Sequence, residues 1–398
     1  MDWFKRLVSK EAPKTGDNEE SSSSSSIVTI KPPIVTPTKE ELKRKIEEQK
    51  SKEKELIVAL NAAWKQHEDC KMKDKPSKYA ALMNSFLLLY DVQKVSFKTI
   101  KANFPGLMNG FHSAACNFLT EGFLNIMTNG TPSHSPKKRR FQASSTSTDL
   151  DKNQGMERSK ICAKRLYQFL ASEAADTIRV LLILAQELTD IQSLTASGLP
   201  TTLVNIYQTF WQLPAGTIAD TPTAFDKSSP PSSLTSSTPE VRLITLLLQL
   251  CSYKSSIHEL IRTDTLTKIF TMPLAYSDVN QSLRDRIIPV TTTIIKCNID
   301  IEAIEYLHRK DCLAIMIETM SSNFDFYSPS NILDCCTMIL TLLEESVKIS
   351  TKLLEDFNNS MGYNLLTKAL IVLEDKAPES NEHTQLVEYI NDFVFVGE

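Results

Sequence analysis

Apolar residues recur through most of this chain at spacings of three and four, which is the period of an amphipathic helix. Pro105 stands ahead of the clearest example, at a helix start where a missing N–H costs nothing. The apolar positions of that segment are Leu107, Met108, Phe111, Ala115, Phe118, Leu119, Phe123 and Ile126. The same periodicity predicts helices over 78–92, from about 157 to 213, and over about 255–274, 279–296, 300–308, 309–321, 329–345, 346–358, 361–375 and 381–394.

A charged helix is predicted to begin at Thr38. The Thr38 hydroxyl and the Glu41 carboxylate form a capping box, which satisfies helix N–H groups that otherwise have no partner. The residues that follow carry opposite charges four apart, which is typical of a solvated helix: Glu40 with Arg44, Glu41 with Lys45, and Glu48 with Lys52. Apolar residues come only later, so we expect this helix to pack by its C-terminal half, through Leu56, Ile57, Leu60 and Trp64.

Three segments interrupt the helical pattern. Residues 1–37 contain the serine run 21–26 and a proline-rich stretch, and they cannot bury enough apolar surface to offset their ordering entropy. We therefore expect a disordered tail over 1–37, a disordered basic insert over 129–156 and a flexible loop over 214–238. These segments predict an N-terminal helical region, 38–128, and a second helical domain, 157–395, which contains the flexible loop.

The second domain is predicted to resume after that loop with a capped helix. Thr238 supplies a capping hydroxyl, Pro239 suits the first helical position, and Glu240 lies at the positive end of the helix dipole. Helices of similar length then follow with short connectors, and Pro289 is expected to kink one of them. The predicted fold is all-α, an irregular armadillo- or HEAT-like stack of helical hairpins. Its expected core positions are Leu247, Leu248, Ile339, Leu342, Leu343, Leu353, Leu354 and Phe357.

Composition supports this fold and argues against an enzyme. The chain has only 10 glycines in 398 residues, although 41% of its residues are hydrophobic. Glycine supplies the backbone conformations of phosphate loops and nucleophile elbows, and neither GxGxxG nor GxxxxGK[ST] is present. The segment Gly110–Ala114 lacks the last glycine of a GxSxG elbow. We expect no catalytic residue, no cofactor and no small-molecule substrate.

Charge and cysteine content restrict the ligands and the cellular location that we expect for this protein. The formal net charge is −4, so we expect no direct binding to nucleic acid and no general attraction to acidic membranes. The eight cysteines are scattered, which suits reduced thiols in a cytosolic or nuclear protein better than a disulfide framework. The N-terminus lacks the features of a secretory signal, and the apolar runs are too short to cross a membrane. The predicted location is cytoplasmic, with the nucleus as an additional possibility.

One group of residues invites a metal-site interpretation. His308 and Cys312 are four residues apart and could share a helical face, with Cys335 and Cys336 as further ligands. Zinc sites prefer spacings that let two thiolates converge, whereas adjacent side chains on a helix diverge by about 100°. The favoured interpretation is therefore three buried cysteines and an exposed His308 at a helix end, with no metal.

The sharpest local signal is a basic run in the predicted insert. Lys137, Lys138, Arg139 and Arg140 are consecutive and resemble a nuclear-import signal, and Ser135 precedes a proline as in proline-directed kinase sites. Phosphorylation of Ser135 would cancel about two of these charges. The run is therefore a candidate import signal or electrostatic tether, and a solvated loop without a receptor is the alternative.

Several blocks, in order, resemble the N-terminal region of the Alfy-type (autophagy-linked FYVE) BEACH–WD40 family. The collinear blocks are Ala163–Leu170, Leu199–Val204, Tyr207 with Leu213–Pro214, Leu250–Ser252, Tyr306–Leu313, and Leu353–Phe357 with Gly362–Leu366. The resemblance covers about 38–394, and the order and spacing of the blocks carry it. It implies an armadillo-like scaffold with a role in selective autophagy or membrane trafficking.

Some properties of the family cannot be transferred to this chain. Family members bear PH–BEACH, WD40 and lipid-reading FYVE modules further along, and this sequence shows none of their motifs. The chain therefore resembles an N-terminal fragment, a short isoform or a truncated gene model, and membranes would be reached only indirectly, through modules that it lacks. The sequence predicts a non-enzymatic scaffold whose partners are other proteins. The alternative is a nuclear-targeted adaptor or regulator controlled by the basic run 137–140.

Overall fold

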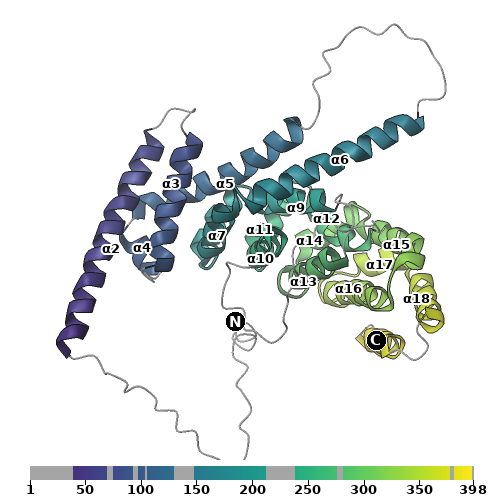
Figure 1. Cartoon of the computed structure of the whole chain (residues 1–398). Helices are drawn as coiled ribbons and strands as arrows, with labels where there is room; N and C mark the ends of the chain where they lie inside the picture. Colours follow the sequence, from purple (N-terminus) through teal and green to yellow (C-terminus); the bar gives the residue numbers. More distant parts are fainter. Residues whose placement is uncertain are drawn as a thin grey trace, which may run out of the picture. The chain divides into compact units, whose positions relative to one another are not determined.

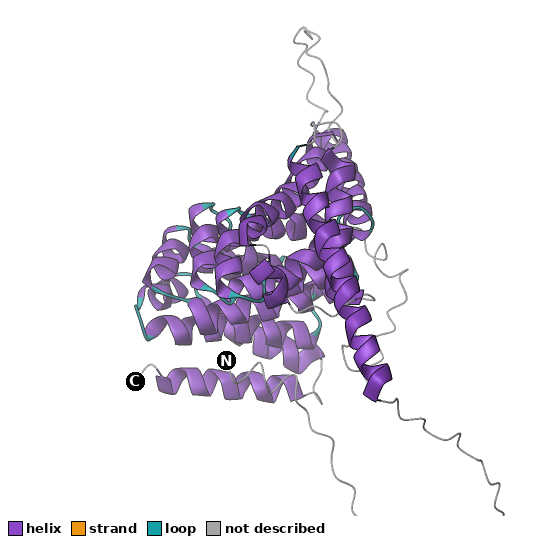
Figure 2. Ribbon diagram, turned by 90° about the vertical axis from the view of Figure 1, so that its left-hand side faces the viewer, coloured by secondary structure: helices purple, strands orange, loops and turns teal. Residues whose placement is uncertain are grey.

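The structure is a computed structural model that describes residues 39–69, 75–92, 97–103, 105–129, 148–211, 238–275, 281–376 and 381–396. Among these residues all regular secondary structure is helical, which confirms the predicted all-α class (Figure 2). Contacts divide the chain into two compact units, Met1–Lys50 and Ser51–Glu398. Apart from the first turns of α2, the elements described below belong to the second unit.

The first half of the described chain is built from long helices. Their bounds are α2 Lys39–Glu68, α3 Lys75–Leu87, the π-helical turn η2 Leu88–Val92, α4 Phe97–Asn103, α5 Pro105–Asn129, α6 Thr148–Ala171 and α7 Ala175–Leu184. The solvated start of α2 is confirmed, since its described residues before Ser51 are exposed. Arg44 pairs with Glu48 at 3.3 Å, one turn later than the predicted partner Glu40.

The C-terminal half of α2 packs as the sequence predicts. Leu60 is completely buried, and Leu56, Ile57 and Trp64 pack against the core. Trp64 lies over Gly110 of α5 so closely that a Cβ atom there would come within 2.6 Å of the indole ring. One turn of α3 is tied to α7 by a buried hydrogen bond of 2.9 Å from the Tyr79 hydroxyl to Thr177 Oγ1.

From Leu188 onward the described chain forms three-helix repeats. The repeats are α8 Leu188–Ala196, α9 Leu199–Phe210 and α10 Pro239–Cys251; then α11 Lys254–Arg262, α12 Leu266–Thr271 with η3 Met272–Leu274, and α13 Gln281–Asn298; then α14 Ile301–Arg309, α15 Cys312–Asn323 with η4 Phe324–Phe326, and α16 Pro329–Val347; and finally α17 Lys352–Asn359, α18 Gly362–Lys376 and α19 Asn381–Val396. The predicted helical stack is thus present, with three helices in each repeat.

Helices that hold the same position in successive repeats stack on one another (Figure 1). The first layer is α8, α11, α14 and α17; the second is α9, α12, α15 and α18; the third is α10, α13, α16 and α19, with α7 packed on α10 in the same way. One hydrophobic core runs through the repeats and continues into the preceding helices, from Leu60 to Leu386. Each layer is therefore a row of equivalent helices, as in repeat proteins whose units contact mainly their neighbours.

Hydrogen bonds join the first two repeats in every layer. In the first layer the hydroxyls of Thr195 and Ser256 lie 2.9 Å apart. In the second layer Lys268 donates to the Asn205 side chain at 2.9 Å. In the third layer the buried Asn298 amide donates to the carbonyl oxygen of Cys251 at 2.7 Å. These bonds fix the stacking of the repeats.

The corner between the first and second helix is the same in each repeat. Gly198, Asp264, Asp311 and Met361 stand two residues beyond the first helix, and they are the described residues with positive φ, at 75°, 56°, 48° and 59°. The amide of each donates to the carbonyl oxygen three residues earlier. A left-handed residue after a helix terminates it and turns the chain, so this repeated corner sets the short connectors of the stack.

Several predicted boundaries shift. One helix was expected over 255–274, but the corner at Asp264 divides this segment into α11 and α12. The described part of α6 begins at Thr148, before the expected resumption near 157. Thr238 and Pro239 begin α10 as predicted, but the Thr238 hydroxyl makes no capping hydrogen bond. Pro239 pre-sets the helical φ without that hydroxyl.

Most predicted core positions are buried, whereas two are not. Leu247, Ile339, Leu342, Leu343, Leu353 and Phe357 are at most 1% exposed. Leu248 and Leu354 are only half-buried, because each lies at the edge of the buried face of its helix. Pro289 lies inside α13, as predicted. The predicted tail 1–37 lies outside the described residues, as do positions 130–147 of the predicted insert and 214–237 of the predicted loop.

Candidate functional site

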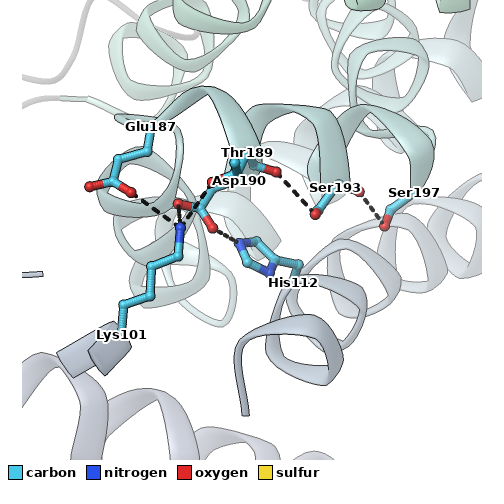
Figure 3. Close-up of polar contacts among 7 residues, drawn as sticks. All are labelled: Lys101, His112, Glu187, Thr189, Asp190, Ser193 and Ser197. Carbon is cyan, nitrogen blue, oxygen red and sulfur yellow. Dashed lines mark hydrogen bonds and ion pairs between the residues drawn. The ribbon is translucent and has the colours of Figure 1, made fainter. Parts of the chain in front are cut away.

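A group of charged side chains lies where α4 and α5 meet α8 (Figure 3). Lys101 of α4 donates to Asp190 Oδ2 at 2.9 Å, to Glu187 Oε2 at 3.1 Å and to the Thr189 hydroxyl at 3.0 Å. On the other side of the carboxylate, Nε2 of His112 lies 3.0 Å from Asp190 Oδ1. We call Lys101, His112, Glu187 and Asp190 the polar joint.

The polar joint is largely closed to solvent. The side chains of His112 and Asp190 are 2% and 3% exposed, whereas Lys101 and Glu187 are about one-third exposed at its edge. Burial alone would lower the pKa of Lys101, but its hydrogen bonds to Asp190 and Glu187 outweigh burial and raise it. Lys101 therefore stays charged, and its charge compensates the buried carboxylate of Asp190.

The polar joint links helices that are far apart in the sequence. A His–Asp pair orients a catalytic base only when a nucleophile stands within reach of the imidazole. The Thr189 hydroxyl contacts Lys101, whereas Ser193 donates to the Thr189 carbonyl oxygen and Ser197 to the Ser193 carbonyl oxygen (Figure 3). The polar joint therefore holds α4 and α5 against α8, which is the first helix of the first repeat.

A second set of ion pairs runs along the first layer. Asp300 caps α14 by accepting from the Ala303 amide at 3.0 Å, and it also lies 3.0 Å from Lys254 and 3.1 Å from His258 of α11. The next pair of helices is joined by Lys352 and Glu305 at 2.7 Å. These contacts link neighbouring repeats across the surface.

The residues of the possible metal site separate in the structure. Cys312, Cys335 and Cys336 are at most 1% exposed, and His308 turns outward to Asp356 of α17 at 2.8 Å. Burial raises the pKa of the Cys312 thiol to about 12 and that of Cys336 well above its ordinary value. In the part of the chain that the structure describes, no three such side chains are placed to hold a metal ion. The favoured prediction of buried cysteines and an exposed histidine is confirmed.

A third feature lies on the third layer. Three arginines stand on these helices: Arg179 of α7, Arg242 of α10 and Arg286 of α13, each directly before a buried aliphatic residue, Val180, Leu243 and Ile287. We call these three side chains the arginine row. On the next helix of the layer, α16, Asp334 precedes the buried Cys335. The row crosses three helices that pack side by side (Figure 1).

Sequence reasoning missed both the polar joint and the arginine row. The candidate residues that it chose, Ser135 and Lys137–Arg140, lie outside the described residues. His112 carried a usable signal, since it falls beside Phe111 and near Ala115 on the apolar face of its helix. An ionisable side chain on a buried face requires a buried partner, but the sequence did not indicate that the partner is Asp190.

Comparisons with protein families and with solved structures identify no family for this chain. No protein-family description matches the chain, and no solved structure matches it. In the described segments, no helix is both long enough and apolar enough to cross a membrane.

Proposed function

We propose that this chain is a helical scaffold that acts through protein–protein contacts and not by catalysis. The observation that carries the proposal is the stack of three-helix repeats, in which each layer offers a row of equivalent helices. Repeat proteins of this kind use such extended surfaces to bind partner helices or extended peptides. The polar joint supports the same function, because it braces the preceding helices against α8 at the start of the stack.

The resemblance to Alfy-type BEACH proteins supports a more specific proposal, a role in selective autophagy or membrane trafficking. Its collinear blocks fall at corresponding places in the stack: Leu199–Val204 begins α9, Tyr306–Leu313 covers the corner between α14 and α15, and Gly362–Leu366 begins α18. The family's lipid-binding modules are not carried over, so the proposed contacts are with proteins of those pathways.

Proximity labelling in cells would test this proposal. The full chain is fused to a biotin ligase and compared with Leu247→Asp, which places a charge at a completely buried position and should unfold the stack. We expect a reproducible set of neighbours, enriched in autophagy or trafficking proteins, that is lost in the variant. Neighbours that are the same for both proteins would contradict a scaffold, and a set without autophagy or trafficking proteins would contradict the pathway.

The basic run favours a second candidate, a nuclear adaptor or regulator. Replacing Lys137, Lys138, Arg139 and Arg140 together with alanine should then abolish nuclear entry of the tagged chain. A matched control replaces Lys43, Arg44, Lys45 and Lys50, a similar set of cations in α2. An unchanged distribution of the first variant would contradict an import function of the run.

A further inference from the structure

We propose that the groove between α15 and α18 is a docking site for an amphipathic helix of a partner protein that carries a basic side chain. This inference rests on the proposed scaffold function and assigns one binding surface to it. The two helices are neighbours in the second layer (Figure 1). They run in the same direction, because Lys368 donates to the Ser321 carbonyl oxygen at 2.9 Å and, further along both helices, Lys376 donates to the Phe324 carbonyl oxygen at 2.9 Å.

The floor of this groove is apolar. It is lined by the buried Ile317 of α15, the buried Leu365 of α18 and the partly exposed Ala314. The volume of the groove is about 300 Å³. Small-molecule pockets occupy about 300–1,000 Å³, so the groove lies at the lower limit of that class. A space of this size between two helices suits a few apolar side chains of a protein partner better than a cofactor.

Exposed aliphatic side chains stand beside the groove. Met361 lines it at the start of α18, Ile315 lies one turn before Glu318 on α15, and Ile371 lies one turn beyond Lys368 on α18. Single exposed apolar residues are ordinary on a protein surface, whereas a group of them around a groove is typical of an interaction site. A helix laid in the groove would cover these side chains together with the floor.

Met361 provides an independent indication of a partner. Its φ of 59° is left-handed, which is unfavourable for a residue with a Cβ atom, whereas the other described residues with positive φ are a glycine and two aspartates. The corner is fixed, since a Cβ atom at the following Gly362 would collide with the Phe357 ring. The Met361 side chain is 69% exposed, so packing within the chain does not compensate the strain. Strained residues gather at binding sites, and the flexible methionine side chain adapts to apolar partner surfaces.

The rim of the groove carries a carboxylate that suits a basic ligand. Glu318 is exposed and forms no ion pair within the described residues. The cation that lines the groove, Lys368, is already bound to the Ser321 carbonyl oxygen and lies 5.1 Å from the centre of the Phe324 ring. A basic side chain on the ligand would therefore pair with Glu318, whereas an acidic one would be repelled by it.

The walls of the groove favour a helical ligand over an extended one. Both walls are α-helices, whose backbone groups are hydrogen-bonded within each helix. An extended segment would bring N–H and C=O groups that find no backbone partner there, whereas a helix satisfies its own. The lining spans two turns of each wall, 314–321 and 361–368. This length of about 10 Å matches ligand side chains at i, i+4 and i+7 of a helix.

Isothermal titration calorimetry of synthetic helices into the full chain tests this proposal. The probe is a peptide of about 15 residues, built from alanine and glutamine, with leucines at i, i+4 and i+7 and an arginine at i+3. A second peptide has glutamate in place of the arginine, and a third has the same composition with the leucines dispersed around the helix. We expect the arginine peptide to bind with a Kd of about 100 μM, about fivefold or more tighter than either of the others.

Two variants of the chain separate recognition from folding. Glu318→Lys should reverse the preference between the arginine and glutamate peptides, which a change in stability cannot do. Met361→Gly should weaken the arginine peptide by about fivefold or more, although removal of the strained side chain should stabilise the protein. Glu121→Lys is the matched control, because Glu121 is an exposed glutamate of α5 outside the groove. It should leave both affinities unchanged, and circular dichroism checks that each variant is folded.

Three results would overturn the proposal: no binding of the arginine peptide up to about 1 mM, equal binding of the arginine and glutamate peptides, or an unchanged preference in Glu318→Lys. Sedimentation tests a second copy of this chain as the occupant. A wild-type dimer that Glu318→Lys dissociates would assign the groove to self-association and would also contradict a partner helix. If the cellular neighbours of the chain persist in these cases, the scaffold function stands and only this docking site is wrong.

Discussion

Asp190 accepts a hydrogen bond of 2.9 Å from Lys101, a residue 89 positions away in the sequence. This bond joins α4 to α8, and His112 of α5 approaches the other oxygen of the same carboxylate at 3.0 Å. One buried aspartate thus ties two of the N-terminal helices to the first repeat. Its removal should reveal how strongly the repeat stack depends on the helices that precede it.

Asp190→Ala should destabilise the protein by about 3 kcal/mol, because it leaves Lys101 and His112 without their buried anion. Urea unfolding followed by circular dichroism measures this loss. Glu187→Ala is the internal control: Glu187 also pairs with Lys101, but at an edge that is about one-third exposed, and its removal should cost about 1 kcal/mol or less. Equal losses in the two variants would show that Asp190 has no special role.

Met361→Gly should stabilise the protein by about 0.5–1 kcal/mol. Met361 holds the left-handed corner between α17 and α18 at a φ of 59°, and a side chain with a Cβ atom pays for that conformation whereas glycine does not. Met361 is 69% exposed, so little packing is lost. The change in melting temperature measures the effect. Thr367→Gly, at an exposed site inside α18, should destabilise by a similar amount.

The charge of Asp300 should stabilise the protein in a pH-dependent way. Burial alone would raise the pKa of Asp300, but hydrogen bonds from the Ala303 amide, His258 and Lys254 outweigh burial and hold it below its ordinary value of 3.8. A carboxyl whose pKa is lower in the folded state contributes stability above its unfolded pKa and loses it as the pH falls through the folded pKa.

Asp300→Asn separates this charge from the helix cap, because asparagine caps a helix about as well as aspartate. We expect the variant to be less stable than the wild type by about 1 kcal/mol at neutral pH. The difference should shrink as the pH falls below 3.8. Urea unfolding over a series of pH values measures it, and a difference that is constant with pH would show that the charge does not contribute.

Local sequence signals predicted the ends of helices well where those ends depend on residues close by in the chain. Pro329 begins α16 next to Ser328, which accepts from the Asn331 amide, so proline and a capping hydroxyl are both used there. The corners were predictable only in part. Gly198 suits a left-handed residue, whereas Met361 does not, and for this reason the regular repetition of the corners was not visible in the sequence.

Contacts between helices far apart in the sequence determine packing that the hydrophobic periodicity could not predict. A Cβ atom at Gly122 of α5 would collide with the Phe169 ring of α6, so this glycine serves close packing and not a turn. The same limit applies to the arginine row, whose members are separated by interruptions of unequal length. Nothing in their spacing shows that they stand on neighbouring helices until α7, α10 and α13 pack side by side.

The sequence by itself determined that this protein is all-α, where most of its helices lie and which faces they bury, because helix period, capping and proline placement act over a few residues. Only the tertiary structure decided that the helices form three layers, that Lys101 and His112 contact Asp190, and that Arg179, Arg242 and Arg286 stand on neighbouring helices. These arrangements depend on packing between helices far apart in the chain, where the choice of partner is a property of complementary surfaces and not of local pattern.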